Sequence, residues 1–502
     1  MLQTIDHFLK RADLRLLIFA VLCLNYLSWV PGENEEEYFA FAKHFMNPDW
    51  IPHALSVTDL PGTRIIFEVV VGFGLRYLSF EQMAVVGRCI GAALLCLPLA
   101  LIFRRLRLSH LQALLFVQIC SLFPHQSFFG KEWIFGSFET KTIAYALVLY
   151  SFYLMLECRY RQSAIVAGLA VWFHVLVGGW YSVVLFIYLL LLRTPWRQLL
   201  GHGLWVAAIC LPFLAYLGQS YLRDNPGVIG GIPISWVYVY FRNAHHLAPF
   251  GPEGEISDSF LRGVIITGLI FLICWYLAAT RKHDDQGRLA LFFIAAFIQQ
   301  ALFLILAYFD TQGEILKYYP FRSSALSFFT SLLIAFVAAN HLGEKVLPPS
   351  QRHIRRVTAA LGLIAVLGLG FNLYKNARDS YTLLYPPPQE ADRQALYRWI
   401  GEHTPRDAKF LNMNDRKRDD LDFMRRTERD RFSVFKFVPT SNRRIYDWYL
   451  RAKEKQRVLD DPGYLAELRK HYRIDYLVSQ QPITGAGVTQ VYANNHYRLY
   501  RF

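Results

Sequence analysis

About eleven long apolar stretches recur along the chain and constrain its fold more than any other feature. Most approach the roughly 20 residues that a helix needs to cross a bilayer. Their apolar residues are continuous rather than alternating, which favours helices over strands. Only 18% of the residues are charged, fewer than in a typical soluble protein. The sequence therefore predicts an α-helical polytopic membrane protein with spans near 15–30, 83–103, 109–123, 140–157, 162–177, 180–193, 199–217, 262–280, 288–308, 321–341 and 357–373.

Basic residues cluster at alternate ends of these stretches and predict the orientation of the chain. If the N-terminus is inside, every cluster lies on the cytoplasmic side, as the positive-inside rule requires. The odd number of spans then places the C-terminal part outside. No small-residue cleavage site follows the first stretch, which indicates an uncleaved span. The clusters are Arg104, Arg105 and Arg107; Arg159 and Arg161; Arg193 and Arg197; Arg281 and Lys282; and Lys345, Arg352, Arg355 and Arg356.

The predicted location is the bacterial inner (cytoplasmic) membrane, with a periplasmic C-terminal domain. In a soluble protein the net charge of +14 would suggest a nucleic-acid partner. Here the basic residues flank the apolar stretches, so membrane lipids are the expected partners and nucleic acid is not. The seven cysteines form no CxxC pair and lie in or beside apolar stretches, so neither a zinc site nor a disulfide framework is predicted.

The composition changes after residue 375, where two predicted domains meet. Residues 1–375 form a transmembrane domain with long outer segments at 31–64, 124–139, 218–261 and 309–320. The run Pro386-Pro387-Pro388 marks a stiff linker. Residues 376–502 combine helical patterns with short strand-like runs and predict a small periplasmic α/β domain. Its expected helices are 389–402, 441–457 and 462–471, and its expected strands are 410–411, 432–437, 476–479, 488–492 and 497–500.

An acidic run, Glu33-Asn34-Glu35-Glu36-Glu37, follows the first apolar stretch directly. A helix is predicted from Glu35 to Met46. At 100° per residue, its apolar face consists of Tyr38, Phe41, Ala42 and Phe45. Glu35 projects onto this face, whereas Glu36 lies well away from it and the other acids point to the far side. We therefore expect Glu35 to face a protein cavity and its neighbours to be solvated or to stabilise the helix dipole.

In these features the chain resembles the GT-C superfamily of membrane glycosyltransferases, which use polyprenyl-phosphate-linked sugars. The matching features are ENEEEYFAFA at 33–42, the basic turn after the second main span and the outer C-terminal domain. Protein O-mannosyltransferases, oligosaccharyltransferases and lipid A aminoarabinose transferases share this layout. The resemblance covers the architecture of nearly all 502 residues, although its sequence-specific part is short. It implies a GT-C-like fold and a catalytic acid in the first outer segment, for which Glu35, Glu36 and Glu33 are the candidates.

The resemblance lacks one usual element of the family, an aspartate in the acidic run. No metal ligands are therefore assigned. The reaction implied by the family requires no cofactor, because a phosphate on lipid is a reasonable leaving group, and a divalent cation is compatible with it.

Further polar residues of the outer segments are candidates for substrate binding. Asp59 would be a second acid and Arg64 a phosphate ligand, although both also fit ordinary turn chemistry. Arg242, His245 and His246 follow an aromatic run and would suit a sugar phosphate headgroup.

Lys317 and Arg322 lie at the outer start of the tenth span, against the positive-inside trend. We expect Arg322 to bind the lipid phosphate, with Lys317 in support. Glu139 and Lys141 begin a span, where they are expected to pair with each other, to snorkel or to join the site. His174 lies inside an apolar stretch, where a hydrogen-bonded core histidine is expected.

The sequence thus favours a glycosyltransferase that moves a sugar from a polyprenyl-phosphate donor to an acceptor glycan, lipid or protein on the periplasmic face, with inversion. Glu35 would be the general base. Two alternatives stay open. One is a lipid flippase or transporter, whose sign would be Gly/Pro-broken spans in two matching halves. The other is a non-catalytic GT-C-like protein that binds a glycolipid or acts as a scaffold in envelope biogenesis.

Overall fold

The computed structural model describes residues 2–221, 225–251, 253–281, 284–345, 348–414, 420–483 and 487–502. Within these ranges, six helices are long and apolar enough to cross a membrane, and four shorter helices are also apolar. A small mixed sheet lies near the C-terminus. The predicted fold class, a helical membrane protein with a small C-terminal α/β part, is therefore confirmed. Lys282 and the side chains of Lys345, Arg352, Arg355 and Arg356 lie outside what the structure describes.

Contacts between residues divide the chain into two compact units. The first, here called the membrane unit, comprises Met1–Leu27, Val85–Gly218 and Tyr238–Ala377. The second, here called the C-terminal unit, comprises Ser28–Ala84, Gln219–Val237 and Arg378–Phe502. Residues 28–84 and 219–237, which include parts of two long outer segments, thus group by their contacts with the C-terminal residues. A linear change of composition cannot reveal such a grouping, because it arises from contacts between distant segments.

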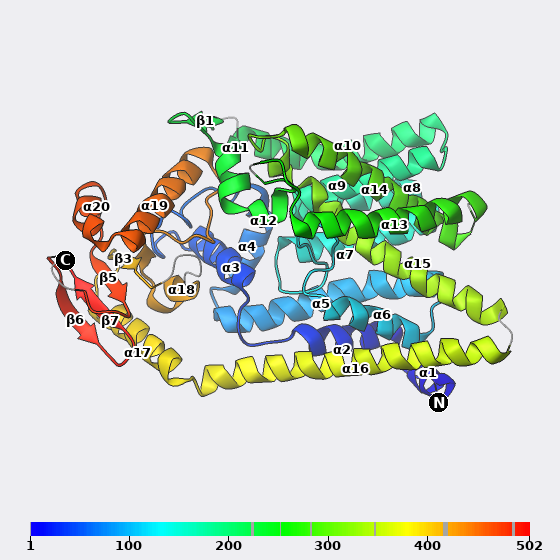
Figure 1. Cartoon of the computed structure of the whole chain (residues 1–502), viewed down its shortest axis with the longest axis horizontal. Helices are drawn as coiled ribbons and strands as arrows, with labels where there is room; N and C mark the ends of the chain where they lie inside the picture. The colour runs from blue at the N-terminus through cyan, green and yellow to red at the C-terminus, as the bar shows by residue number, and fades with distance from the viewer. Residues whose placement is uncertain are drawn as a thin grey trace. The chain divides into compact units, whose positions relative to one another are not determined.

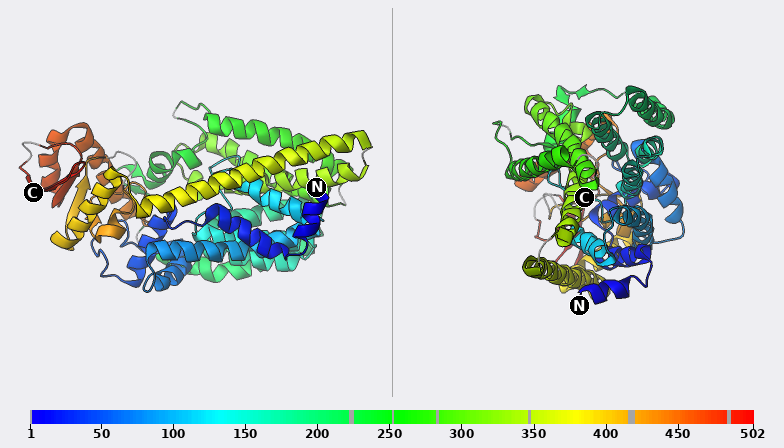
Figure 2. Two further views of the ribbon diagram at one scale, coloured as in Figure 1. Left: turned by 90° about the horizontal axis from the view of Figure 1, so that it is seen from below. Right: turned by 90° about the vertical axis from the view of Figure 1, so that its right-hand side faces the viewer.

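Helices make up nearly all of the membrane unit (Figure 1). The right-hand view of Figure 2 shows many of them end-on, so their axes run in roughly one direction. They are α1 (Leu2–Leu9), α2 (Leu14–Tyr26), α5 (Phe80–Arg105), α6 (His110–Leu122), α7 (Thr140–Leu156), α8 (Tyr160–Phe173), α9 (Val175–Leu191), α10 (Trp196–Tyr221), η2 (Val237–Arg242), α12 (Ala244–Leu247), α13 (Asp258–Thr280), α14 (Asp285–Phe309), η3 (Leu316–Tyr318), η4 (Pro320–Ser323), α15 (Ser324–Lys345) and α16 (Pro348–Leu384).

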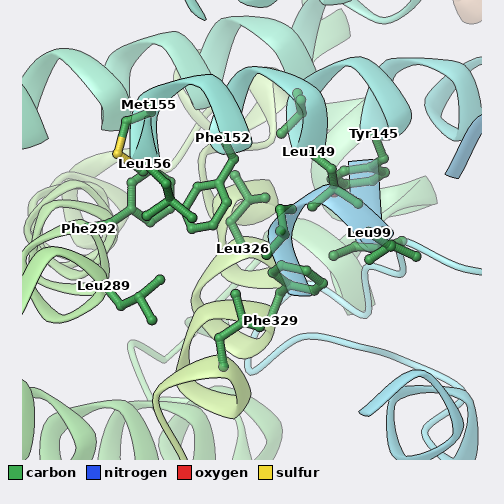
Figure 3. Close-up of a cluster of buried hydrophobic side chains, with 14 of the residues drawn as sticks. Leu99, Tyr145, Leu149, Phe152, Met155, Leu156, Leu289, Phe292, Leu326 and Phe329 are labelled. Atoms are coloured by element: carbon green, nitrogen blue, oxygen red, sulfur yellow. The ribbon is translucent and has the colours of Figure 1, made fainter. Parts of the chain in front are cut away.

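The centre of the membrane unit is a cluster of buried apolar side chains from α5, α7, α14 and α15 (Figure 3). Lipid is as apolar as these side chains, so close packing rather than exclusion of water holds the helices together. The labelled members are Leu99, Tyr145, Leu149, Phe152, Met155, Leu156, Leu289, Phe292, Leu326 and Phe329.

One helix boundary in this unit differs from the prediction. The sequence suggested a break between stretches 162–177 and 180–193, near Gly178-Gly179. The structure breaks the chain at His174, between α8 and α9. Gly178 instead packs against α8, where an added Cβ would lie 2.5 Å from the Val171 backbone nitrogen. The glycine therefore allows close helix packing and does not end a helix.

A five-stranded sheet organises the C-terminal unit, with strand order β4-β3-β5-β7-β6. β3 runs parallel to β4 and β5, and β7 runs antiparallel to β5 and β6. The elements of this unit are α3 (Glu33–Met46), η1 (Gly62–Arg64), α4 (Ile65–Gly74), β1 (Val228–Ile229), β2 (Ile232–Pro233), α11 (Ile234–Trp236), α17 (Pro388–His403), β3 (Lys409–Asn412), α18 (Phe423–Thr427), β4 (Asp430–Arg431), α19 (Asn442–Asp460), η5 (Pro462–Tyr464), α20 (Leu465–His471), β5 (Tyr476–Ser479), β6 (Thr489–Ala493) and β7 (Arg498–Arg501).

The three helices predicted for this region are present as α17, α19 and α20, and four of the five predicted strands are present. The exception is 432–437, where the structure has irregular backbone. Phe432, Val434 and Phe437 are nevertheless buried there. Their burial explains the strand-like pattern in the sequence.

The first outer segment shares a hydrophobic core with the C-terminal residues. Phe41 and Trp50 are buried in one cluster with side chains of α17 and of the sheet, such as Leu396, Phe410 and Leu499. Burying each large apolar side chain contributes about 1.5–3 kcal/mol. This core fixes α3, and therefore the acidic run at its start, to the C-terminal residues.

Candidate functional site

Arg322 lies in η4 and is held by contacts from distant parts of the membrane unit. Its side chain is only 10% exposed, and its Nε lies 2.9 Å from Glu132 Oε1. Its Nη1 lies 2.6 Å from His174 Nε2. The guanidinium also lies over the Tyr319 ring, 4.5 Å from its centroid. Ion pairing, a hydrogen bond and a cation–π contact thus fix the guanidinium from three sides.

A second cation, Lys141, adjoins this arginine through the same carboxylate. Its Nζ lies 3.4 Å from Glu132 Oε2 and 3.3 Å from Glu139 Oε1. The predicted pairing of Glu139 with Lys141 is therefore present, with Glu132 as a second partner. We call Arg322, Lys141, Glu132, Glu139 and His174 the Arg322 cluster. Its two cations and two carboxylates sum to zero charge, which makes its burial tolerable.

Glu132 is the shared carboxylate of the Arg322 cluster, and its side chain is 5% exposed. Burial by itself would raise its pKa. Arg322 and Lys141 outweigh burial and hold the pKa of Glu132 below its usual range. The carboxylate therefore stays ionised at neutral pH.

The backbone before Arg322 is shaped by local polar contacts. The Asp310 carboxylate accepts hydrogen bonds from the backbone N–H groups of residues 314, 315 and 316, each at 2.8 Å. Tyr319 then adopts a left-handed conformation with φ of 51°. Such a conformation is costly for a bulky residue and is kept only where the surroundings impose it. Gln299 also donates to the Pro320 carbonyl at 2.8 Å, which ties η4 to α14.

The other predicted ligands of the membrane unit lie outside the Arg322 cluster. Lys317 pairs with Glu314 at 2.5 Å, and both side chains are substantially exposed. His245 is exposed, and its ring lies against that of His246. Arg242 ends η2, and its Nη1 lies 3.3 Å from Asn243 Oδ1.

His246 contributes indirectly, through the loop that carries Glu132. Its Nδ1 lies 2.7 Å from the Gly130 carbonyl oxygen, which requires Nδ1 to donate. Burial, reinforced by His245, lowers the pKa of His246 to about 3. The ring is therefore neutral at physiological pH and serves as a hydrogen-bond donor to this loop.

The acidic run begins α3 in the C-terminal unit, and its members have different surroundings. The side chain of Glu33 is 76% exposed, as predicted. Glu35 is fully buried, as predicted, but its Oε2 accepts a hydrogen bond from the Gly32 N–H at 2.6 Å. This contact is half of a capping box, in which the side chain satisfies a backbone donor at the helix start. Glu35 therefore has a structural function that its place on the helix face did not reveal.

Glu36 was predicted to be solvated or to stabilise the helix dipole, and it is not solvated. The residue is 6% exposed, and Arg425 contacts both of its carboxylate oxygens, with Nη2 2.8 Å from Oε1 and Nε 3.0 Å from Oε2. Arg425 also pairs with Glu81. We call Glu36, Glu81 and Arg425 the Glu36 cluster. Burial raises the pKa of Glu36 to about 7, although Arg425 opposes the shift.

Helix phase misled the prediction because α3 is buried on two sides. Glu35, Phe39 and Ala42 are buried, and so are Glu36 and Ala40. The hydrophobic pattern alone marked only one of these faces.

Asp59 and Arg64 make structural contacts with the segment that leads into α19. Asp59 Oδ2 accepts hydrogen bonds from the backbone N–H groups of Thr440 and Ser441, at 2.8 and 2.7 Å. Arg64 pairs with Glu68 at 3.0 Å and donates to Thr440 Oγ1 at 3.0 Å. These contacts give both residues a structural role. That role does not depend on the predicted functions of Asp59 as a second acid and Arg64 as a phosphate ligand.

Four residues of the two clusters are not evident as site residues from the sequence: Glu132, His174, Glu81 and Arg425. Glu132 and His174 had one available signal: a basic residue at the start of a span needs a nearby polar partner. Glu81 and Arg425 had no such signal, because each looks like an ordinary charged residue of a helix.

Metal binding was left open by the sequence. Among the residues that the structure describes, no group of three or more His, Cys, Asp or Glu side chains is arranged to hold a metal ion. In the acidic run, Glu35 caps its helix and Glu36 faces a guanidinium. These two carboxylates are therefore poorly suited to ligate a cation in this arrangement.

Comparison with known proteins gives similarity of fold at low sequence identity. No protein-family model and no curated protein sequence matches the chain. The oligosaccharyltransferase of Archaeoglobus fulgidus, solved with zinc and sulfate, is similar over 93% of this chain and 68% of its own, with 13% identity and a TM-score of 0.46. ArnT of Cupriavidus metallidurans, solved in the apo state, is similar over 97% of this chain and 95% of its own, with 13% identity and a TM-score of 0.45. The similarity to these GT-C glycosyltransferases thus extends over nearly the whole chain.

Proposed function

We propose that this chain is a membrane glycosyltransferase that moves a sugar from a polyprenyl-phosphate donor to an acceptor at the outer face of a bacterial inner membrane. The acceptor is a glycan, a lipid or a protein. The observation that carries the proposal is Glu36, a buried carboxylate with a pKa of about 7 in the acidic run through which the sequence resembles the family. A general base works best when its pKa lies near the working pH.

In the proposed reaction, Glu36 takes the proton of an acceptor hydroxyl. The oxygen of that hydroxyl attacks the anomeric carbon of the donor sugar at the same time. The bond from that carbon to the donor phosphate oxygen breaks, and the leaving phosphate keeps the electron pair. Attack opposite the leaving group inverts the anomeric configuration. Independently of Glu36, we assign Arg322 of the membrane unit to binding of the donor phosphate. No step requires a metal ion.

Glu36 replaces Glu35 as the proposed base for a physical reason. The Glu35 carboxylate already serves the helix start through the Gly32 N–H. Glu36 can exchange a proton near neutral pH, and Arg425 holds both of its oxygens in place. Arg425 therefore orients the base and stabilises its ionised form.

Transfer assays with single glutamine variants test the proposal. Purified protein in lipid nanodiscs is given polyprenyl-phosphate-linked sugars and envelope acceptors. Glu36→Gln keeps the side-chain shape and should lower turnover by about 10²–10⁴-fold. Glu33→Gln, at the exposed start of the same helix, is the matched control and should change turnover by less than roughly tenfold.

Other outcomes of this assay would revise the proposal. Loss of transfer in Glu35→Gln with normal transfer in Glu36→Gln would return the base to Glu35. Normal transfer in both would contradict a base in the acidic run.

Topology mapping is a second test. Cysteine substitutions at the exposed residues Glu33 and Glu402 should react with a membrane-impermeant reagent from the periplasm, whereas one at the exposed Arg107 should react only after the inner membrane is opened. A cytoplasmic residue 402 would overturn the proposed outer-face reaction.

A non-catalytic role is the second candidate, and one observation favours it. Glu35 and Glu36 are both engaged by other groups of the protein, Gly32 and Arg425. A glycolipid-binding or scaffold protein would need nothing more from them. This candidate predicts donor binding without turnover in the wild-type protein and in all the glutamine variants.

A further inference from the structure

His174 lies at the junction of two helices, where its two ring nitrogens face different groups. Nε2 lies 2.6 Å from Nη1 of Arg322, a residue 148 positions later in the chain. Nδ1 lies 3.4 Å from the backbone nitrogen of Val177, in the first turn of α9. The ring thus contacts a guanidinium through one nitrogen and a helix N-terminus through the other.

The chemistry of the arginine fixes the protonation of this ring. A guanidinium only donates hydrogen bonds, so Nε2 must carry a lone pair. The imidazole is then neutral, with its proton on Nδ1. The Val177 contact is long for a hydrogen bond, and an Nδ1 that carries a proton cannot accept it. The short contact with Arg322 is therefore the one that defines the state of the ring.

A neutral acceptor has a specific consequence in this cluster. Glu132 and Glu139 already balance Arg322 and Lys141, so a third carboxylate in the place of His174 would leave a net negative charge. Such a charge would repel a phosphate. The neutral imidazole orients the guanidinium and adds no negative charge that would offset the charge of the arginine.

We propose that His174 is a positioning residue for phosphate recognition: as a neutral acceptor at Nη1, it holds the Arg322 guanidinium in the orientation that receives the anionic phosphate of the lipid-linked donor. This inference rests on the proposed function, in which Arg322 binds that phosphate. Glu132 fixes the Nε side of the guanidinium and His174 fixes the Nη1 side. Together they determine the plane in which the arginine presents its N–H groups.

Two conservative variants separate this role from a purely structural one. The Oε1 of glutamine can occupy the position of His174 Nε2, so His174→Gln keeps an acceptor for Arg322. The Oδ1 of asparagine can occupy the position of Nδ1, so His174→Asn keeps only an acceptor for the start of α9. A helix cap would be rescued by asparagine, whereas a positioning residue is rescued by glutamine.

The matched control is another buried histidine of the membrane unit. His202 lies in α10 and is 3% exposed, and its Nδ1 lies 3.3 Å from the Tyr160 carbonyl oxygen. His202→Asn keeps a donor for that carbonyl. It makes the same chemical change as His174→Asn at a site with no described contact to Arg322.

The first measurement is the binding of polyprenyl-phosphate-linked sugar and of polyprenyl phosphate alone to the full-length protein in nanodiscs. His174→Asn should weaken binding of both by about 10–100-fold, the range expected for a lost hydrogen bond to a charged group. His174→Gln and His202→Asn should stay within roughly threefold of wild type. In transfer assays, His174→Asn should raise the KM for the donor more than it lowers kcat. Equal weakening by asparagine and glutamine, or rescue by asparagine, would overturn the proposal.

The second measurement needs no ligand. Melting temperatures are compared for wild type, His174→Asn, Arg322→Gln and the double variant. If the two residues contact each other as described, the double variant should melt close to Arg322→Gln, because their effects do not add. Strictly additive shifts would contradict the positioning role. Failure of the wild-type protein to bind either lipid would contradict the proposed function and leave this coupling as a separate result.

Discussion

Each of the two units holds a largely buried arginine in a charged cluster, and the partners of the two arginines differ in charge. In the membrane unit, Arg322 lies between the carboxylate of Glu132 and the neutral ring of His174. In the C-terminal unit, Arg425 lies between two carboxylates, Glu36 and Glu81. With all carboxylates ionised, the Arg322 cluster sums to zero, whereas the Glu36 cluster sums to minus one.

This difference in charge separates the tasks that the two clusters can perform. A neutral cluster that contains two cations can accept an anion at moderate cost. A cluster with one excess carboxylate favours proton uptake. Burial raises the pKa of Glu36 to about 7, and the negative charge of Glu81 adds to the shift. Two arginines of similar exposure therefore suit different chemistry, phosphate binding in one unit and proton transfer in the other.

The largest expected effect is on stability, at Arg425. Arg425→Met leaves the buried Glu36 and the partly exposed Glu81 without their shared cation. Removing one partner of a buried ion pair typically costs about 3–5 kcal/mol. The loss should be greater at pH 8 than at pH 5, because at the lower pH Glu36 holds a proton. Thermal unfolding in detergent at the two pH values measures it.

The control for this variant is an exposed arginine of the same unit. Arg473 pairs with Asp407 and Asp475, but its side chain is 57% exposed. Arg473→Met should shift the melting temperature little, because exposed pairs contribute little to stability. Equal losses in the two variants would show that Arg425 does not have the special position that its burial indicates.

The next effect is on donor binding, and it tests the comparison between the two arginines directly. Arg322→Ala should weaken binding of a polyprenyl-phosphate sugar by about 10–100-fold, as for loss of a hydrogen bond to a charged group. Arg322→Lys should recover only part, because lysine lacks the planar fork of N–H groups. Arg425→Lys should leave donor binding within roughly threefold of wild type. Equal binding by wild type, Arg322→Ala and Arg322→Lys would remove the phosphate assignment.

A smaller effect concerns the pH dependence of turnover. If Glu36 acts as a base, it must be ionised, so turnover should rise with pH to a plateau with a midpoint near its pKa of about 7. Below the midpoint the rate should fall about tenfold per pH unit. The residual turnover of Glu36→Gln should not show this fall at low pH, here called the acid limb. Glu33→Gln, which alters an exposed carboxylate, should keep it. If turnover of Glu36→Gln still fell at low pH as in wild type, the fall would come from the titration of another group.

The smallest effect is the contribution of Glu36 to stability as a function of pH. Its pKa is higher in the folded protein than in the unfolded chain, where it is close to 4.5. Between these values the folded state binds more protons, so the stability contributed by the protonated side chain is lost as pH rises from about 4.5 to about 7. Glu36→Gln should flatten the melting temperature across this window relative to wild type. If the wild-type protein instead gained stability as the pH rose, and Glu36→Gln removed that gain, the inferred direction of the pKa shift would be wrong.

Much of the fold could be read from the sequence because apolar runs and helical periodicity are local properties. The spans near 83–103, 262–280 and 288–308 correspond to α5, α13 and α14, and the short helices of the C-terminal part were located to within a few residues. The break at His174 was misplaced because two glycines nearby resemble a helix end. Only the packed neighbour of Gly178 explains why those glycines lie inside α9.

The features of the candidate sites also fall into two groups, those that the sequence determined and those that only the tertiary structure decided. The sequence by itself determined that acids begin α3, that a basic pair lies at the outer start of the tenth span and that Glu139 and Lys141 can pair. It could not choose the partners, because they lie far along the chain: Arg425 is 389 positions from Glu36, and Arg322 is 148 positions from His174. Only the tertiary structure decided that Glu35 caps its own helix while Glu36 meets an arginine. The physical reason is that the energy of a buried charge depends on the groups folded around it, whereas helices and spans depend on residues only a few positions apart.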